Sequence, residues 1–287
     1  MNLPATLQLE KIEARNCQTN GYEIRCRILG KGRPALLLHG WGASWHYWQW
    51  LMPALANSGY RVYAPDLPGH GDSAKPKLEY DSKTYYAFIR GLVEALGLER
   101  FTLAGHSLGG YIALALAEKN PLWVERLILV SPLYCPAQLL KSPVTRVRLP
   151  LLGTLALRLV PQWLVNFAMR FSSLAHSDNV PQSFLRQVAI DYKRATPHIA
   201  NHRVGSPDLR PDLEQVNAPT LVAWGKKDML LSSGFFEELV ERLPSGQAYS
   251  FSNAGHSPLV EMPEEFNRVV LQFLKMERYE QNDGNAG

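Results

Sequence analysis

One serine of this chain has glycines two positions before and two positions after it. Residues 105–109 read Gly-His-Ser-Leu-Gly, directly after the apolar run 101–104. This spacing is typical of a nucleophile elbow, a sharp strand-to-helix turn that exposes a serine hydroxyl. The flanking residues must be small because a Cβ there would clash with the adjacent strand and helix. We therefore predict that Ser107 is a nucleophile between a strand over 100–104 and a helix over 108–119.

A nucleophilic serine needs a general base, and that base needs a carboxylate to orient it. His256 comes directly after a predicted strand over 247–251, and Asp228 comes directly after one over 220–224. Parallel sheets carry their active sites at the carboxyl ends of their strands. We therefore predict a catalytic triad in which Ser107 attacks, His256 is the base and Asp228 orients the imidazole.

Acyl transfer also needs amide donors aimed at the developing oxyanion. The first predicted donor is the N–H of Leu108, the residue after the nucleophile. The second is the Trp41 N–H, from the sequence His-Gly-Trp-Gly at 39–42, where the glycines permit close approach of the backbone to a substrate. We also expect the Trp41 indole to bind substrate as part of the pocket wall. The alternative is that Trp41 only packs.

The seven other histidines are not predicted to hold a metal. Only His198 and His202 show close ligand spacing, and both fall in a segment that we expect to form a lid. His39 and His106 lie inside motifs and are predicted to orient their loops, and His106, next to the nucleophile, is also predicted to contact substrate. The sequence therefore predicts neither a metal nor a cofactor.

Length and composition fit a globular protein with one large core. The chain has 287 residues, of which 46% are hydrophobic, enough for a core domain that carries an insertion. Three cysteines cannot all pair, so we expect free thiols in a reducing compartment. The first residues lack the pattern of a signal peptide, which favours a cytoplasmic location. The most apolar stretch, 149–169, contains Arg158 and Pro161 and is not expected to span a membrane.

Basic residues concentrate in one part of the chain. The formal charge is +4, yet residues 136–210 hold ten Lys and Arg, three Asp and no Glu, a local charge of +7. The rest of the chain therefore carries −3. Nucleic-acid binding is not predicted because no recognised motif accompanies this charge.

Strand and helix patterns alternate on both sides of the basic segment. The predicted strands cover residues 7–14, 22–29, 33–38, 61–64, 100–104, 127–130, 220–224 and 247–251. The predicted helices cover residues 44–57, 84–96, 108–119, 233–242 and 263–275. Ser44 is the expected N-cap of the first helix, and Gly97 is expected to end the second. This alternation predicts an α/β fold with a parallel sheet.

Five segments give the chain a close resemblance to the α/β-hydrolase superfamily, and specifically to serine hydrolases that carry a helical cap. They are LLLHGWGAS (36–44), APDLPGHGDS (64–73), AGHSLGG (104–110), LVAWGKKD (221–228) and NAGHSPLVEMPEEF (253–266). The resemblance implies an eight-stranded, mostly parallel sheet flanked by helices, with a helical lid inserted after strand six. The implied domains are a first core part (1–133), the lid (134–211, here the cap segment) and a second core part with a polar tail (212–287).

The resemblance also bears on individual residues. Asp66, Gly69 and Gly71 are implied to shape a loop beside the site. Some relatives take the triad acid from the end of strand six, where this chain has Ser-Pro-Leu at 131–133 and no carboxylate, which favours Asp228. Haloalkane dehalogenases and epoxide hydrolases place an aspartate at the elbow, so Ser107 argues against their direct alkyl transfer. Meta-cleavage carbon–carbon hydrolases usually carry Gly-Pro-Gly after their His-Gly motif, which residues 41–44 do not match.

These features together predict a serine hydrolase that cleaves carboxylic ester bonds of a partly apolar small substrate through an acyl-enzyme on Ser107. The alternatives on the same triad are a carbon–carbon bond hydrolase, a lactonase and a cofactor-free haloperoxidase. A non-hydrolytic binding protein of the same fold is a further alternative.

The apolar residues of the cap segment, Trp163 among them, are expected to bind substrate, or else to seat the cap on the core. With the local charge of +7, they also suggest a weak contact with anionic lipid surfaces. We expect a monomer or a homodimer.

Overall fold

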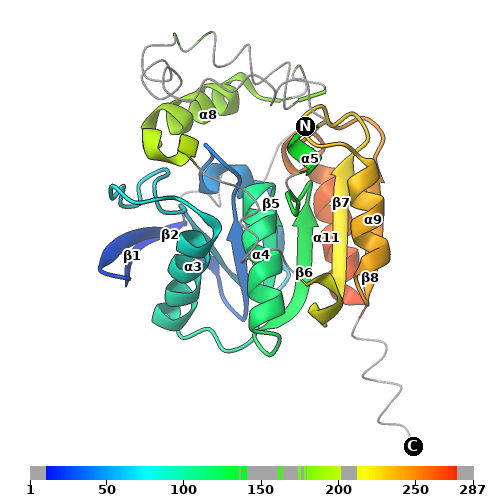
Figure 1. Cartoon of the computed structure of the whole chain (residues 1–287), viewed down its shortest axis with the longest axis horizontal. Helices are drawn as coiled ribbons and strands as arrows, with labels where there is room; N and C mark the ends of the chain where they lie inside the picture. Colours follow the sequence, from blue (N-terminus) through cyan, green and yellow to red (C-terminus); the bar gives the residue numbers. More distant parts are fainter. Residues whose placement is uncertain are drawn as a thin grey trace, which may run out of the picture.

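A computed structural model describes residues 11–135, 137–140, 161, 163, 174–175, 178, 180–201 and 212–276 (Figure 1). Its strands are β1 (Glu13–Thr19), β2 (Tyr22–Gly30), β3 (Arg33–Leu38), β4 (Tyr60–Pro65), β5 (Phe101–His106), β6 (Val124–Val130), β7 (Thr220–Gly225) and β8 (Gly246–Phe251). Its α-helices are α2 (Leu51–Asn57), α3 (Ser82–Leu96), α4 (Leu108–Lys119), α5 (Ala137–Leu140), α8 (Gln182–Arg194), α9 (Gly234–Arg242), α10 (Pro258–Glu261) and α11 (Pro263–Lys275). Short 3-10 helices are η1 (Trp45–Trp48), η3 (Pro197–Asn201) and η5 (Leu213–Gln215).

The eight strands form one sheet in the order β1-β2-β4-β3-β5-β6-β7-β8. The pairings β1–β2 and β2–β4 are antiparallel, and all the others are parallel. This is the predicted mostly parallel sheet of the α/β-hydrolase fold.

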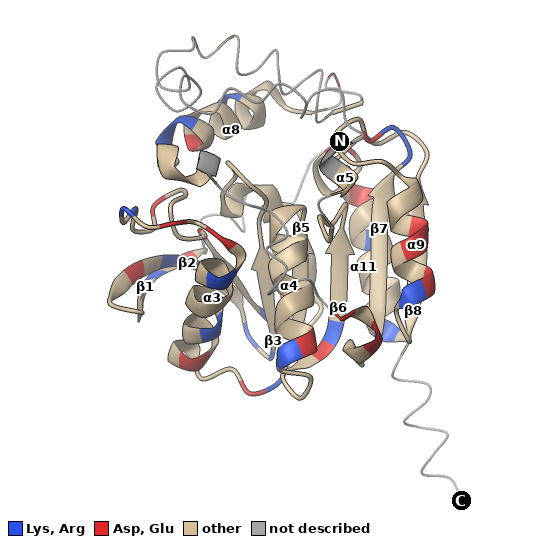
Figure 2. Ribbon diagram, viewed as in Figure 1, with Lys and Arg blue, Asp and Glu red and all other residues tan. Residues whose placement is uncertain are grey.

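Both faces of the sheet are covered, which explains why its central strands are apolar throughout. Along β3, Leu36 and Leu38 pack into one core and Leu37 packs into a second core on the opposite face. The first core includes side chains of α3, α4 and α9, and the second includes side chains of α2 and α11. In Figure 2, β5 carries no charged residue along its length, whereas charges mark the outer helices.

Two predicted elements differ from the structure by more than a few residues at their ends. The first strand begins at Glu13 rather than at residue 7, and residues 7–10 of that prediction lie outside the described part. It is an edge strand whose buried residues are only Cys17 and Thr19, so its alternation gave little signal. The helix predicted over 44–57 is divided into η1 and α2. Pro53 lacks an N–H and its ring would clash with the carbonyl of residue 49, so one continuous helix cannot form there.

The carboxyl ends of the parallel strands lie at one edge of the sheet. Figure 1 shows α8 above this edge of the sheet. Helices α5 and α8 both fall within the cap segment, whose boundaries stay a prediction because most of it lies outside the described residues. All three cysteines are free and buried. Within the described residues, none of the helices has the length and apolar character needed to cross a bilayer.

Candidate active site

Ser107 lies on a strained turn between β5 and α4. Its backbone has φ 52° and ψ −113°, a conformation that residues other than glycine rarely adopt. Hydrogen bonds hold this conformation: the Ser107 N–H donates to the Val130 carbonyl at 3.0 Å, and its own carbonyl accepts from Leu133 N at 3.0 Å. The turn therefore presents the serine at the sheet edge, as the elbow pattern predicts.

The two glycines of the motif are required by close backbone packing. A Cβ on Gly105 would meet the Gly109 carbonyl, and a Cβ on Gly109 would meet the carbonyls of Leu38 and His39. These neighbours are backbone atoms of β3, of His39 directly after it and of α4, and they cannot rotate aside. The elbow is thus compatible only with glycine at both positions.

Asp228 and His256 form the hydrogen bond that a triad requires. Asp228 Oδ2 lies 2.8 Å from His256 Nδ1, and both side chains are buried. The other oxygen, Asp228 Oδ1, accepts from the backbone N–H groups of Leu230 and Leu231 at 2.8 and 2.9 Å. With its Nδ1–H directed at Asp228, the imidazole keeps a lone pair on Nε2 for accepting a proton.

His106 connects the Ser107 turn to the loop that carries His256. Its Nε2 lies 3.1 Å from the His256 carbonyl, and the two rings are 5.0 Å apart. Its other face stacks on Tyr47, with ring centroids 5.4 Å apart. Burial holds the pKa of His106 well below its ordinary value, so the ring is neutral and donates from Nε2. With 3% exposure, this placement favours support of His256 over the predicted contact with substrate.

The loop 39–42 passes directly beside Ser107. A Cβ on Gly40 would lie 3.2 Å from the Ser107 Cβ and 3.1 Å from His106 Nδ1. The Trp41 N–H therefore comes directly after a residue, Gly40, that lies against Ser107. Leu108 is the first residue of α4, where N–H groups have no partner within the helix. Both candidate oxyanion donors thus lie next to Ser107.

The Trp41 indole is 39% exposed and connects the loop to the cap segment. Its Nε1–H donates to the Ile199 carbonyl at 3.0 Å, and its ring meets Tyr192 edge-on at 5.6 Å. Trp163 is 67% exposed, and its immediate neighbours in sequence lie outside the described residues. Its contact with substrate stays a prediction. His202 also lies outside the described residues.

The loop 64–73 contacts the segment that follows the loop 39–42, through Asp66 and Trp45. Asp66 is buried and accepts from Trp45 N at 2.9 Å and from Asp72 N at 2.8 Å. Gly69 and Gly71 have φ of 85° and 45°, which a side chain would strain. These contacts agree with the structural role that the resemblance implies.

Two buried carboxylates near the site were not singled out in the sequence. Glu261 Oε1 accepts from Gly255 N at 2.8 Å, and its Oε2 accepts from Ala175 N at 2.7 Å. Asp191 of α8 binds Ser44 and His46. Glu261 lies inside the motif 253–266 and five residues after His256, a signal that could have found it. Asp191 has no local signal except that it is one of three acids in a basic segment.

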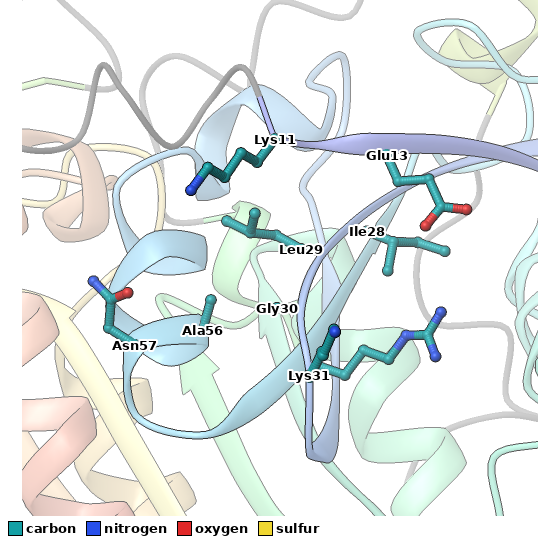
Figure 3. Close-up of a pocket in the computed structure, with 9 residues that line it drawn as sticks. Lys11, Glu13, Ile28, Leu29, Gly30, Lys31, Ala56 and Asn57 are labelled. Carbon is teal, nitrogen blue, oxygen red and sulfur yellow. The ribbon is translucent and has the colours of Figure 1, made fainter.

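A cavity of about 500 Å³ lies elsewhere, lined mainly by residues of β1, β2 and α2 (Figure 3). Its lining residues are Lys11, Glu13, Ile28, Leu29, Gly30, Lys31, Ala56, Asn57 and Arg61. It contains no triad residue and therefore is not the candidate active site. Among the described residues, no group of three or more His, Cys, Asp or Glu side chains is placed to hold a metal ion.

Comparison with known proteins places this geometry in context. The model of the alpha/beta hydrolase family matches residues 35–269. The chain is 29% identical to a soluble epoxide hydrolase of Corynebacterium sp., over 92% of this chain and 98% of that protein. It is 28% identical to the 2-hydroxy-6-oxo-6-phenylhexa-2,4-dienoate hydrolase of Burkholderia cepacia, over 89% and 92%. The crystal structure of a membrane phospholipase A, described as a bacterial virulence factor, is 27% identical with a TM-score of 0.78, over 96% and 92%.

Proposed function

Since this chain belongs to the alpha/beta hydrolase family, we propose that it is a serine hydrolase that cleaves carboxylic ester bonds. The observation that carries this proposal is the pairing of a strained Ser107 turn with the 2.8 Å hydrogen bond between His256 and Asp228. His106 joins the two loops that bear the serine and the histidine. Nucleophile, base and orienting acid therefore come from three strand ends of one sheet.

The proposed reaction begins with acylation of Ser107. His256 Nε2 accepts the hydroxyl proton as Oγ bonds to the acyl carbon. The carbonyl oxygen becomes an oxyanion, which the N–H groups of Leu108 and Trp41 bind. His256 then protonates the alkoxide as the C–O bond breaks, which releases the alcohol and leaves the acyl-enzyme.

Deacylation repeats the same proton transfers with water. His256 accepts a proton from water as the water oxygen attacks the acyl carbon. His256 then returns a proton to Ser107 Oγ as the ester bond to Oγ breaks and the acid leaves. Asp228 holds Nδ1–H throughout and stabilises the imidazolium. No net proton or electron is left on the protein.

The serine at the elbow distinguishes this proposal from the chemistry named for some relatives. A soluble epoxide hydrolase and a carbon–carbon bond hydrolase are both similar to this chain. Ser107 favours an acyl-enzyme over alkyl transfer to a carboxylate. Residues 41–44 lack the Gly-Pro-Gly stretch usual in carbon–carbon hydrolases. Ester cleavage is therefore the reaction that we place first.

Hydrolysis of p-nitrophenyl esters from acetyl to palmitoyl, with Ser107→Ala as the control, tests this function. We expect turnover that peaks at one chain length and falls by about 10³-fold or more in the variant. Labelling of Ser107 by a fluorophosphonate without turnover of any ester would contradict ester hydrolysis. Carbon–carbon and lactone substrates would then be tested on the labelled, competent nucleophile. Absence of both labelling and turnover would favour a binding protein.

We propose in addition that the cap segment makes weak contact with anionic lipid surfaces. The local charge of +7 over residues 136–210 and their apolar content support this, as does likeness to a structure named as a membrane phospholipase A. Co-sedimentation with phosphatidylglycerol vesicles and with phosphatidylcholine vesicles is the test. Equal binding to both kinds of vesicle would contradict the role of charge.

A further inference from the structure

A buried carboxylate of the cap segment lies against the loop beside the nucleophile. Asp191, on α8, is 2% exposed. Its Oδ2 accepts the Ser44 hydroxyl at 2.6 Å and lies 2.9 Å from His46 Nδ1. Its Oδ1 accepts from Gln187 Nε2 at 2.9 Å. Both carboxylate oxygens are therefore hydrogen-bonded, as a buried charge requires.

The contacts also keep this carboxylate ionised. Burial by itself would raise the pKa of Asp191, but the hydrogen bonds and charge of His46, with those from Ser44 and Gln187, bring the pKa below its ordinary value. An ionised Asp191 accepts from both Ser44 and His46 on the same oxygen. The Ser44 hydroxyl donates to a carboxylate and is only 1% exposed, so this Ser-His-Asp cluster is not a second nucleophile.

Ser44 ends the loop that passes beside Ser107. Its Oγ also accepts from His46 N at 3.2 Å and so caps η1. The loop is therefore fixed at both ends. At one end Gly40 packs so closely on Ser107 that a Cβ on Gly40 would lie 3.2 Å from the Ser107 Cβ. At the other end Ser44 is hydrogen-bonded to Asp191. Trp41, whose N–H is the proposed oxyanion donor, lies between them.

Two more contacts from the same part of the cap segment reach this loop. The Ile199 carbonyl accepts from the Trp41 indole. Gly42 has φ 69°, and a Cβ there would lie 2.7 Å from the Tyr192 ring. The loop is thus held from the cap segment at Trp41, Gly42 and Ser44, and Asp191 makes the charged contact among these three.

We propose that Asp191 is a positioning residue that, through Ser44, sets the place of the Trp41 N–H relative to Ser107. This inference rests on the proposed function, because an oxyanion donor matters only if Ser107 attacks a carbonyl. Misplacing a donor weakens transition-state binding more than substrate binding. Loss of Asp191 should therefore lower kcat by about 10- to 100-fold and leave KM within about threefold.

A double-mutant cycle tests the connection. Asp191→Ala, Ser44→Ala and the double variant are compared with the wild type by kcat, KM and the rate of Ser107 labelling by a fluorophosphonate. If Asp191 acts through Ser44, kcat of the double variant is no lower than kcat of the more impaired single variant. Ser183→Ala, an exposed change in the first turn of α8, is the matched control and should keep wild-type values.

The outcomes separate this inference from the proposed function. Wild-type kcat in Asp191→Ala, losses that multiply in the double variant, or a change in KM alone would overturn the positioning role. If Asp191→Ala does not fold, Ser44→Ala decides by itself, and wild-type kcat there overturns the role. If the wild type hydrolyses no ester, the ester function fails, while the labelling rates of the same variants still decide the positioning role.

Discussion

The Glu261 carboxylate binds the backbone on both sides of His256. Its Oε1 accepts from Gly255 N at 2.8 Å and from Ser257 N at 3.4 Å, while its Oε2 accepts from Ala175 N at 2.7 Å. Glu261 is 4% exposed. One buried carboxylate therefore holds the loop of the proposed base and a residue of the cap segment at the same time.

We expect Glu261→Gln to destabilise the protein and to slow it. An amide has one acceptor oxygen, so at least one of the three N–H groups loses its partner, at a cost of about 1–3 kcal/mol in the free energy of unfolding. Displacement of His256 should also lower kcat. Urea unfolding and ester turnover measure the two effects. Glu264→Gln, at an exposed position in α11, should change the unfolding free energy by no more than about 0.5 kcal/mol.

Asp228→Asn should lower kcat by about 10³- to 10⁴-fold. An amide that donates to Nδ1 would fix the imidazole with its proton on Nε2, where it cannot accept the Ser107 proton. Steady-state turnover and the rate of fluorophosphonate labelling measure the loss. The control is Asp81→Asn, at the N-cap of α3, where asparagine caps equally well. A rate for Asp228→Asn within tenfold of the wild type would show that another group orients His256.

Gly109→Ala should reduce both stability and turnover. The added Cβ would meet the backbone carbonyls of Leu38 and His39, and relief of that clash must move α4 away from β3. We expect a loss of about 1–3 kcal/mol in the free energy of unfolding and a lower kcat, because Ser107 moves with α4. A Cβ on Gly234 meets nothing within 4 Å, so Gly234→Ala should be nearly neutral. Equal effects of the two substitutions would contradict this explanation.

The Asp191 contacts should stabilise the fold in a pH-dependent way. The pKa of Asp191 is lower in the folded protein than its ordinary value of 3.8. Its contribution to the free energy of unfolding is therefore full above about pH 5. This contribution is lost as the pH falls below 3.8 and passes through the lower pKa that Asp191 has in the folded protein. We expect the difference in urea midpoint between the wild type and Asp191→Asn to be present at about pH 5 and to shrink as the pH falls below 3.8. A difference that stays constant down to pH 3 would contradict the assignment of an ionised Asp191.

Local patterns in the sequence determined most of the fold and the candidate triad. The helices 108–119 and 263–275 were predicted with their observed bounds, and Gly97 ends α3 in a left-handed conformation as expected. The candidate nucleophile, acid and base were predicted because each follows a strand, and strand ends of a parallel sheet meet at one edge. The bounds of the edge strand β1 were predicted less well, because only two of its residues are buried and its alternation pattern is weak.

Only the tertiary structure decided how the cap segment meets the site. Asp191 is 147 residues from Ser44, and no periodicity or spacing connects positions so far apart. His106 was expected to orient its loop, and the structure shows which partners it has: its ring packs between Tyr47 and His256, while its contact with substrate stays a prediction. In each case the partner is chosen by how separate elements pack. A sequence pattern records which face of an element is buried, but it does not record what lies against that face.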